Sequence, residues 1–219
     1  MESWTYERLY EAAARTAAAP AGREIGAGDR VLLSAGPSPR SIATILGVLG
    51  AGACIVPVDM QLGMKPLRRV LDVSGVRLGF TSQERADALL DAGDELNLVV
   101  LDGGHKKAET WEEFTSDQTG EFAETDPEAE AAVFFTSGTT GTVKGVPLTH
   151  ANISHQINTL VDSELVSPDD RMLLPLPVHH VSPFVVSVLL PLALGMAIVI
   201  PASLTGPELV RAMREGRVT

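Results

Sequence analysis

The sequence predicts an α/β fold of largely parallel sheets covered by helices. The first observation behind this prediction is that helical and extended hydrophobic patterns alternate along the chain. The second is composition: of 219 residues, 45% are hydrophobic and 21% are charged, which suffices for a globular core. A disordered chain is therefore excluded.

In the first half of the chain, four expected helices alternate with four expected strands. The periodicity is clearest in helix 38–49, where Ile42, Ile45, Leu46 and Leu49 follow the spacing of a core-facing helix. Glycines at the end of this helix are expected to let it pack tightly against the next strand. The expected helices are 6–18, 38–49, 65–73 and 84–90, and the expected strands are 30–35, 54–58, 77–80 and 98–101.

In the second half, a buried strand at 131–135 enters a glycine-rich loop and an extended segment at 145–148 leaves it. Beyond the loop, helices are expected at 151–164 and 207–215, and a strand at 171–174. The intervening residues 181–202 carry no charge and reach the length of a membrane-spanning helix. Because Pro183, Pro191 and Gly195 interrupt them, we expect a buried helix of about ten residues and a strand at 196–200, without a transmembrane segment.

An acidic segment separates the two halves. Nine acidic residues and no lysine or arginine occur from Glu109 to Glu130, which predicts a solvated connector and leaves an acidic interaction patch as an alternative. Trp111 and Phe114 are expected to hold it to the surface in a short helix. The predicted organisation is a first α/β part at 1–108, the connector at 109–130, and a second α/β part at 131–219 that carries the loop.

Net charge and cysteine content limit the partners. A net charge of −11, from 17 basic and 28 acidic residues, argues against nucleic-acid and anionic-membrane binding. Cys54 is the only cysteine, so no intrachain disulfide or cysteine zinc site is expected, and we interpret it as a small core residue. A cytoplasmic location fits this, and residues 1–10 lack the apolar core of a secretion signal. The oligomeric state is left open.

The glycine-rich loop is the strongest functional signal in the chain. Gly138 and Gly141 lack a Cβ, so the backbone can reach positive φ and direct successive N–H groups to one point. Lys144 adds a positive charge, and hydroxyl donors come from Thr136, Ser137, Thr139, Thr140 and Thr142. This combination predicts a polyphosphate site.

The loop is not a Walker A motif, which needs Gly-x-x-x-x-Gly-Lys followed by Ser or Thr. The sixth residue from Gly138 is Val143, and Gly145 follows Lys144. The flanking segments are both extended, so we expect a strand-loop-strand clamp for phosphate. A glycine turn in a polar hairpin is the alternative.

The stretch from Val133 to Val146 resembles the signature loop of the adenylate-forming ligases. This family includes acyl-CoA synthetases, fatty acyl-AMP ligases, luciferases and peptide-synthetase adenylation domains. The family's loop has an apolar pair, Thr-Ser-Gly-Thr-Thr-Gly, one residue, usually a proline, and Lys-Gly-Val. Val143 stands in place of the proline, which removes a φ constraint but no donor, so phosphate binding is expected to survive.

Other segments carry the same resemblance along most of the chain. Residues 28–33 are similar to an early Gly-Asp-Arg-Val strand, and residues 47–59 are similar to a second family motif. Residues 176–181 are similar to a Leu-Pro-x-x-His-Val segment, which implies that His180, with its neighbour His179, lies beside the acyl pocket and the route of the thiol. Adjacent residues point to opposite sides of an extended chain, so we do not interpret the two histidines as a metal site.

The resemblance implies a two-step activity and the N-terminal part of the ligases' large domain. A carboxylic acid, in our interpretation a fatty acid, is activated by ATP as acyl-AMP and then passed to CoA or a carrier-protein thiol. The implied phosphate-binding residues are Thr136, Ser137, Gly138, Thr139, Thr140, Gly141 and Lys144. Mg²⁺ normally takes part, but no ligand for it can be assigned here.

The family's adenine and magnesium motif, ribose-binding aspartate, hinge and catalytic lysine come later in its chains. We therefore expect no catalytic residue in this chain, and an N-terminal fragment that is inactive alone. Two alternatives stay open: a non-catalytic, nucleotide-binding pseudo-ligase module, and a structural or membrane-associated piece with a vestigial loop.

Overall fold

A computed structural model describes residues 2–18, 25–93, 95–116, 120–137 and 143–219. They form two compact units, Met1–His150 and Ala151–Thr219, and each is described by itself. The predicted α/β class is confirmed, since a mainly parallel seven-stranded sheet with helices on both faces makes up the first unit.

The sheet of the first unit has the strand order β5-β4-β3-β1-β2-β6-β7. All neighbouring strands are parallel except β6 and β7, which are antiparallel. The central strand β1 is flanked by β2 on one side and β3 on the other, so the chain reverses its direction of winding there. The strands are β1 (Arg30–Ser34), β2 (Cys54–Pro57), β3 (Leu78–Thr81), β4 (Asn97–Val100), β5 (Glu109–Thr110), β6 (Glu130–Ser137) and β7 (Val143–Thr149).

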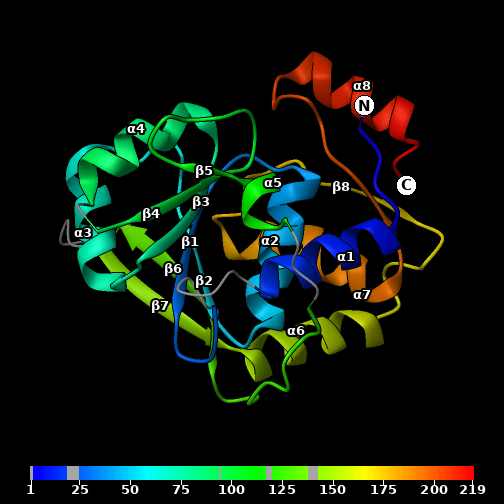
Figure 1. Ribbon diagram of the computed structural model, residues 1–219. Coiled ribbons are helices and arrows are strands. Elements are labelled where there is room, and N and C mark those ends of the chain that lie inside the picture. The colour runs from blue at the N-terminus through cyan, green and yellow to red at the C-terminus, as the bar shows by residue number, and fades with distance from the viewer. Residues whose placement is uncertain (1, 19–24, 94, 117–119, 138–142) are drawn as a thin grey trace. The chain divides into compact units, whose positions relative to one another are not determined.

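Five described helices accompany this sheet. In Figure 1, α3 and α4 cover one face, while α2, with α1 packed against it, and α5 lie on the other. Local sequence sets the start of α2: Ser38 and Ser41 form a reciprocal capping box, and Pro39 occupies the first turn, where no N–H is needed. The helices are α1 (Tyr6–Ala17), α2 (Pro39–Gly50), α3 (Met64–Ser74), α4 (Gln83–Ala92) and α5 (Trp111–Phe114).

Alternating strand residues divide the core into two layers. Leu32, Val56 and Leu98 pack with the apolar residues of α3 and α4. On the other face, Phe80 meets Phe114 of α5 edge to face, with ring centroids 5.1 Å apart, and neither side chain is exposed. The sheet is thus buried on both faces, which explains its nearly continuous apolar strands.

Cys54 belongs to the first of these layers. Burial, with a smaller contribution from the negative charge of Glu130, raises the pKa of its thiol to about 12. The thiol therefore stays protonated at neutral pH, where it is a poor nucleophile.

The glycines of α2 do not face the next strand, so that expectation was wrong. A Cβ on Gly47 would lie 2.6 Å from Cβ of Thr16 and 2.7 Å from the carbonyl oxygen of Ala13, both on α1. Gly50 instead lies under the ring of Phe122. These glycines set the close approach of α1 and of the segment that precedes β6.

The expected short helix at Trp111 and Phe114 is confirmed as α5, and both side chains are buried. The acidic segment lies within the first unit, where the N–H of Ala123 donates to the carbonyl of Gly50. The organisation into 1–108, 109–130 and 131–219 stays a prediction. The compact units divide elsewhere, after His150.

The second unit contains a two-stranded parallel sheet of β8 (Arg171–Leu173) and β9 (Ala197–Val199). The uncharged segment forms a π-helix, η1 (Pro183–Leu189), and α7 (Leu190–Leu194), which ends at Gly195 with a φ of +76°. Among the described residues, no helix is both long and apolar enough to cross a bilayer. The remaining helices are α6 (His150–Asp162), which continues from the first unit, and α8 (Gly206–Gly216).

Candidate functional site

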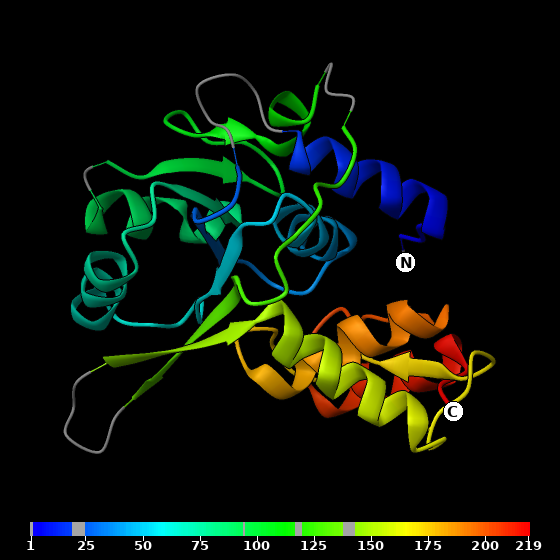
Figure 2. The same ribbon diagram turned by 90° about the horizontal axis from the view of Figure 1, so that it is seen from below.

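The predicted clamp is built on the antiparallel pair β6 and β7 (Figure 2). Strand β6 is anchored in the core through Ala131 to Phe134, which are buried. Beyond that anchor, Thr136 pairs with Lys144 and Ser137 with Val143. The expected strand-loop-strand arrangement is confirmed for the two strands. Gly138, Thr139, Thr140 and Gly141, with Thr142, lie outside the described residues.

Thr136 and Lys144 lie on one face of this pair. Residues directly opposite each other in antiparallel strands project to the same side, with their Cβ atoms about 5 Å apart. Val133 and Phe135 project to the other side, where they join the layer under α3 and α4. A Cβ on Gly145 would come 3.0 Å from Val133 and 3.2 Å from Phe135, so glycine leaves room for that packing.

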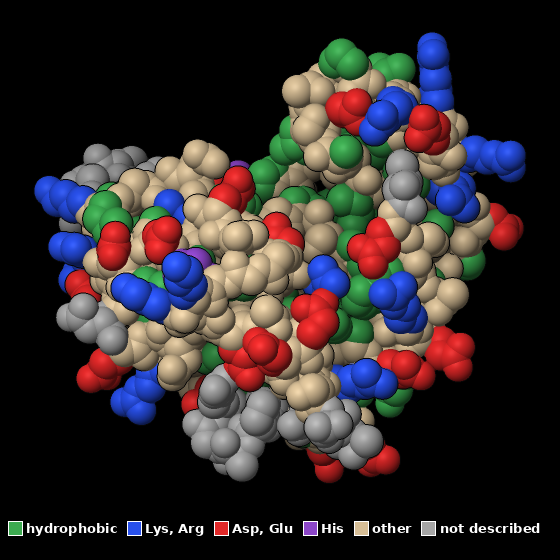
Figure 3. Space-filling view, turned by 45° about the horizontal axis from the view of Figure 1, so that its top comes forward, with side chains coloured by type: hydrophobic (Ala, Val, Ile, Leu, Met, Phe, Trp, Pro, Cys, Tyr) green, Lys and Arg blue, Asp and Glu red, His purple; other side chains and the backbone are tan. Residues whose placement is uncertain are grey.

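Lys144 is available to bind an anion. Its side chain is exposed, and among the described residues no carboxylate lies within ion-pair distance of it. In Figure 3, basic and acidic side chains are intermixed on the face shown. A lysine without a described carboxylate partner, on the same face as a threonine, suits a phosphate.

His150 begins α6 directly after β7, and sequence reasoning did not select it. Burial lowers the pKa of its imidazole, so the ring is neutral at physiological pH. Its Nε2 is buried without a hydrogen-bond partner among the described residues. In the sequence, the only indication of His150 is its position at the end of the strand that leaves the glycine-rich loop.

His179 and His180 lie in a turn of the second unit, separated from η1 by two residues. Their ring centroids are 4.2 Å apart and the rings are tilted by 50°. The expectation that they point to opposite sides was wrong, because the backbone turns here: the N–H of Phe184 donates to the carbonyl of His180. Among the described residues, no group of three or more His, Cys, Asp or Glu side chains is placed to hold a metal ion.

The π-helix that follows the histidines is an uncommon element that is often found at functional sites. Its Phe184, Val185 and Val188 are buried, and His180 itself is exposed. The structure therefore places Thr136 opposite Lys144 in one unit, and His179 beside His180 in the other.

Comparison with known proteins identifies one family over the whole length of the chain. The profile of the family described as AMP-binding enzyme matches residues 1–219. CymA of Salinispora arenicola, described as a nonribosomal peptide synthetase, is 33% identical over 99% of this chain, which spans 3% of that protein. The sulfoacetate–CoA ligase of Cupriavidus necator is 29% identical over 81% of the chain, or 35% of the ligase.

A solved structure shows the same fold. A Rhodopseudomonas palustris protein described as a long-chain-fatty-acid CoA ligase superposes with a TM-score of 0.89 at 21% identity. The match covers 99% of this chain and 55% of that one. The chain thus spans about half or less of the proteins to which it is similar.

Proposed function

Because the chain belongs to the AMP-binding family of adenylate-forming enzymes, we propose that it is the N-terminal part of an ATP-dependent acid–thiol ligase. The full-length ligase of which this chain would be a part, its parent, would activate a carboxylic acid, in the first instance a fatty acid, as acyl-AMP. It would then transfer the acyl group to CoA or a carrier-protein thiol. The single observation that carries this proposal is the exposed cation of Lys144, which has no carboxylate partner among the described residues and lies opposite Thr136 near the end of β6.

Formation of an acyl adenylate brings a carboxylate to the α-phosphate of ATP and releases pyrophosphate. Two anions must approach, so positive charge and N–H donors have to be fixed near the phosphates before they meet. Lys144 supports this role because its charge is not neutralised by a described carboxylate. We propose that Thr136, Ser137, Gly138, Thr139, Thr140, Gly141 and Lys144 bind the pyrophosphate end of ATP. The described residues offer no ligand set for Mg²⁺, so no step is assigned to it.

We further propose that His180, next to His179, lines the acyl pocket near the path of the incoming thiol. Support comes from the exposure of His180 and from the apolar π-helix that follows it. A neutral imidazole offers one donor and one acceptor to a carboxylate or thiol. The fatty-acid assignment rests on residues 179–184, which resemble the matching segment of long-chain acyl-CoA synthetases more than that of peptide-synthetase domains.

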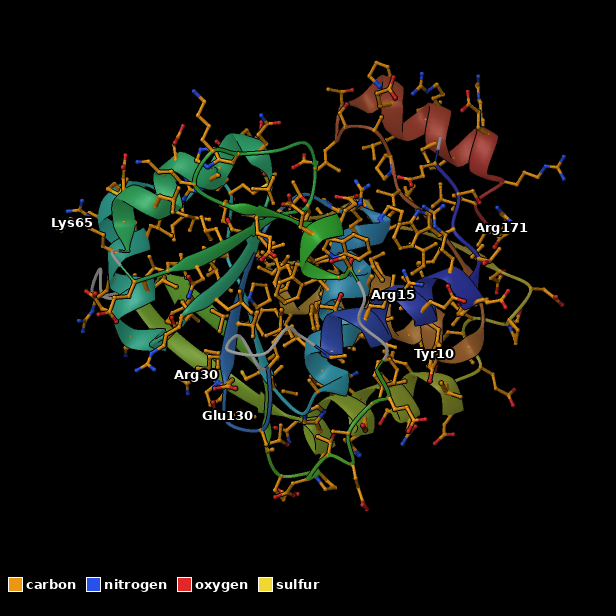
Figure 4. All side chains as sticks on the ribbon, in the orientation of Figure 1. Tyr10, Arg15, Arg30, Lys65, Glu130 and Arg171 are labelled. Carbon is orange, nitrogen blue, oxygen red and sulfur yellow. The ribbon has the colours of Figure 1, made fainter. Side chains whose placement is uncertain are left out.

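Replacing Lys144 with alanine is expected to weaken ATP binding about tenfold or more, because a charge-assisted contact to phosphate is lost. Titration calorimetry of the chain with ATP measures this. Lys65→Ala is the matched control, since Lys65 is an exposed lysine on α3 (Figure 4) and its loss should leave the affinity unchanged.

The calorimetry also separates the alternatives. Equal affinity of the Lys144→Ala variant and the unchanged chain would contradict the phosphate role and favour a vestigial loop. Lysine-dependent binding in a parent that lacks the later catalytic lysine would identify a non-catalytic pseudo-ligase.

We propose that the 219-residue chain does not catalyse adenylation by itself, since it spans about half or less of its relatives. Purified chain mixed with ATP, Mg²⁺ and fatty acids is expected to release no pyrophosphate above the protein-free background. A coupled pyrophosphate assay measures this. Sustained turnover would refute the assignment of the chain as only part of an active site.

A further inference from the structure

A pocket outside the clamp lies between α1, the start of α2 and α5. Its volume is about 270 Å³, and no residue of β6 or β7 lines it. Two tryptophans, three arginines, two glutamates and an alanine form its wall: Trp4, Trp111, Arg8, Arg15, Arg40, Glu11, Glu112 and Ala12. Known pockets of about 300 Å³ hold small ligands, so this one suits a molecule with one or two rings.

The pocket lies at the edge of the sheet where the parallel strands end. Arg40 follows β1 in the first turn of α2, and Trp111 directly follows β5. The guanidinium of Arg40 also donates to the carbonyl oxygen of Leu101, just past the end of β4. In open α/β sheets, ligands bind outside the carboxyl ends of the strands, near the point where the strand order reverses. Here that point is β1.

The two tryptophans give the pocket an aromatic wall. Their ring centroids are 6.1 Å apart and the rings are tilted by 50°. The guanidinium of Arg8 lies 4.3 Å from the centre of the Trp4 ring, and that of Arg40 lies 5.8 Å from the Trp111 ring. Indole and guanidinium planes of this kind are good stacking partners for a flat ring.

The charges of the wall favour an anion. Arg40 is paired with Glu112, and Arg8 lies 3.5 Å from the carboxylate of Glu2. Arg15 has no ion pair or hydrogen bond among the described residues, although Glu11 precedes it by one helical turn. Three arginines against two glutamates give the wall a net charge of +1, in a chain whose net charge is −11.

Two donors in the same wall are unsatisfied. Nε1 of Trp111 and Nε of Arg40 are buried and have no acceptor among the described residues. The side chain of Trp111 is more than nine-tenths buried, with an exposed fraction of 8%. A buried donor without an acceptor is destabilising, and Trp111 and Arg40 carry that cost in the wall of the pocket.

We propose that this pocket binds a small planar anion, a flat aromatic ring that carries a carboxylate or a phosphate. Arg15 binds the anionic group, and the ring lies against Trp4 and Trp111. The site does not depend on the proposed ligase activity, because it shares no residue with the clamp.

Tryptophan fluorescence reports on this pocket directly, because Trp4 and Trp111 are the only tryptophans of the chain. Titration of the chain with AMP or with benzoate is expected to change the emission and to saturate. AMP supplies a phosphate and benzoate supplies a carboxylate, so comparing the two titrations shows which of these anionic groups the pocket binds. Adenosine, which has the ring without the charge, and inorganic phosphate, which has the charge without the ring, are expected to bind more weakly.

Arg15→Gln is expected to weaken binding of the better ligand about tenfold, since a charge-assisted contact is lost while a polar side chain is kept. Arg69→Gln is the matched control, because Arg69 is an exposed arginine on α3 outside the pocket wall. Lys144→Ala should also leave this fluorescence change intact. Thermal unfolding by circular dichroism confirms that each variant is folded.

Several outcomes would overturn the proposal. One is the absence of a saturable change with AMP or benzoate up to about 10 mM, a concentration at which even millimolar affinity is detected. Another is equal ligand affinity of Arg15→Gln and the unchanged chain. Adenosine or phosphate binding as tightly as AMP would also contradict a planar anion. An AMP response that needs Lys144 and not Arg15 would place the ligand in the clamp and leave the proposed function untouched.

Discussion

Replacing Phe80 with alanine is expected to lower the free energy of unfolding of the chain by about 3–5 kcal/mol, the usual cost of deleting a buried aromatic ring. Phe80 lies on β3 in the middle of the sheet and is fully buried. Its ring also meets Phe114 edge to face, a contact that adds about 0.5–1.5 kcal/mol beyond burial. Because Phe114 is the last residue of α5, the substitution also loosens that helix on the sheet. Urea denaturation followed by circular dichroism measures the change.

Two further variants serve as controls for the size of this loss of stability. Phe80→Leu keeps most of the buried volume and is expected to cost about half as much or less. Phe122→Ala removes a ring that is 40% exposed and is likewise expected to cost less than Phe80→Ala. A loss below about 1 kcal/mol for Phe80→Ala would mean that α5 does not pack on β3 as described.

Most of the fold follows from local patterns. Hydrophobic periodicity predicts the long helices and strands to within two residues of their observed ends, as in 65–73 for α3 and 171–174 for β8. Strand β5 was not predicted, because two residues carry no periodicity. The apolar helix before β9 was predicted, but its π-helical form was not, because an apolar run does not specify its hydrogen-bond register.

The two candidate sites differ in how far the sequence predicts them. The clamp is contiguous, so its glycines, hydroxyls and Lys144 can be interpreted from one stretch and its two flanking strands. The planar-anion pocket draws on α1, α2 and α5, which come together only when the sheet forms. Its one local signal is that Arg8 and Arg15, seven residues apart, fall on the same side of a helix.

Long-range packing also explains why the role of Gly47 was predicted wrongly. A glycine near the end of a helix indicates a close approach, but the sequence does not say which element approaches. The sequence alone suggested the following strand, whereas the structure places α1 there, with the carbonyl oxygen of Ala13 2.7 Å from the position of a Gly47 Cβ. Helix α1 therefore depends on this glycine for its position beside α2, and so does the wall of the planar-anion pocket.

Gly47→Ala is accordingly expected to destabilise the chain by about 1–2 kcal/mol. Alanine gains about 1 kcal/mol of helix propensity over glycine, but overpacking costs about 1–3 kcal/mol and sometimes more. Overpacking prevails here because one clash is with a backbone oxygen, so all of α1 has to move. Urea denaturation gives the change in stability, and Trp4, in the segment before α1, reports the displacement by fluorescence.

Gly36→Ala is the matched control, because a Cβ on Gly36 meets nothing within 4 Å and its φ is not in the positive range. Reduced freedom of the unfolded chain should leave that variant unchanged or more stable by up to about 1 kcal/mol. If Gly47→Ala were as stable as Gly36→Ala, α1 would not pack closely on α2. Destabilisation confined to Gly47→Ala, together with a changed tryptophan signal, would show that contact between α1 and α2 holds the pocket together.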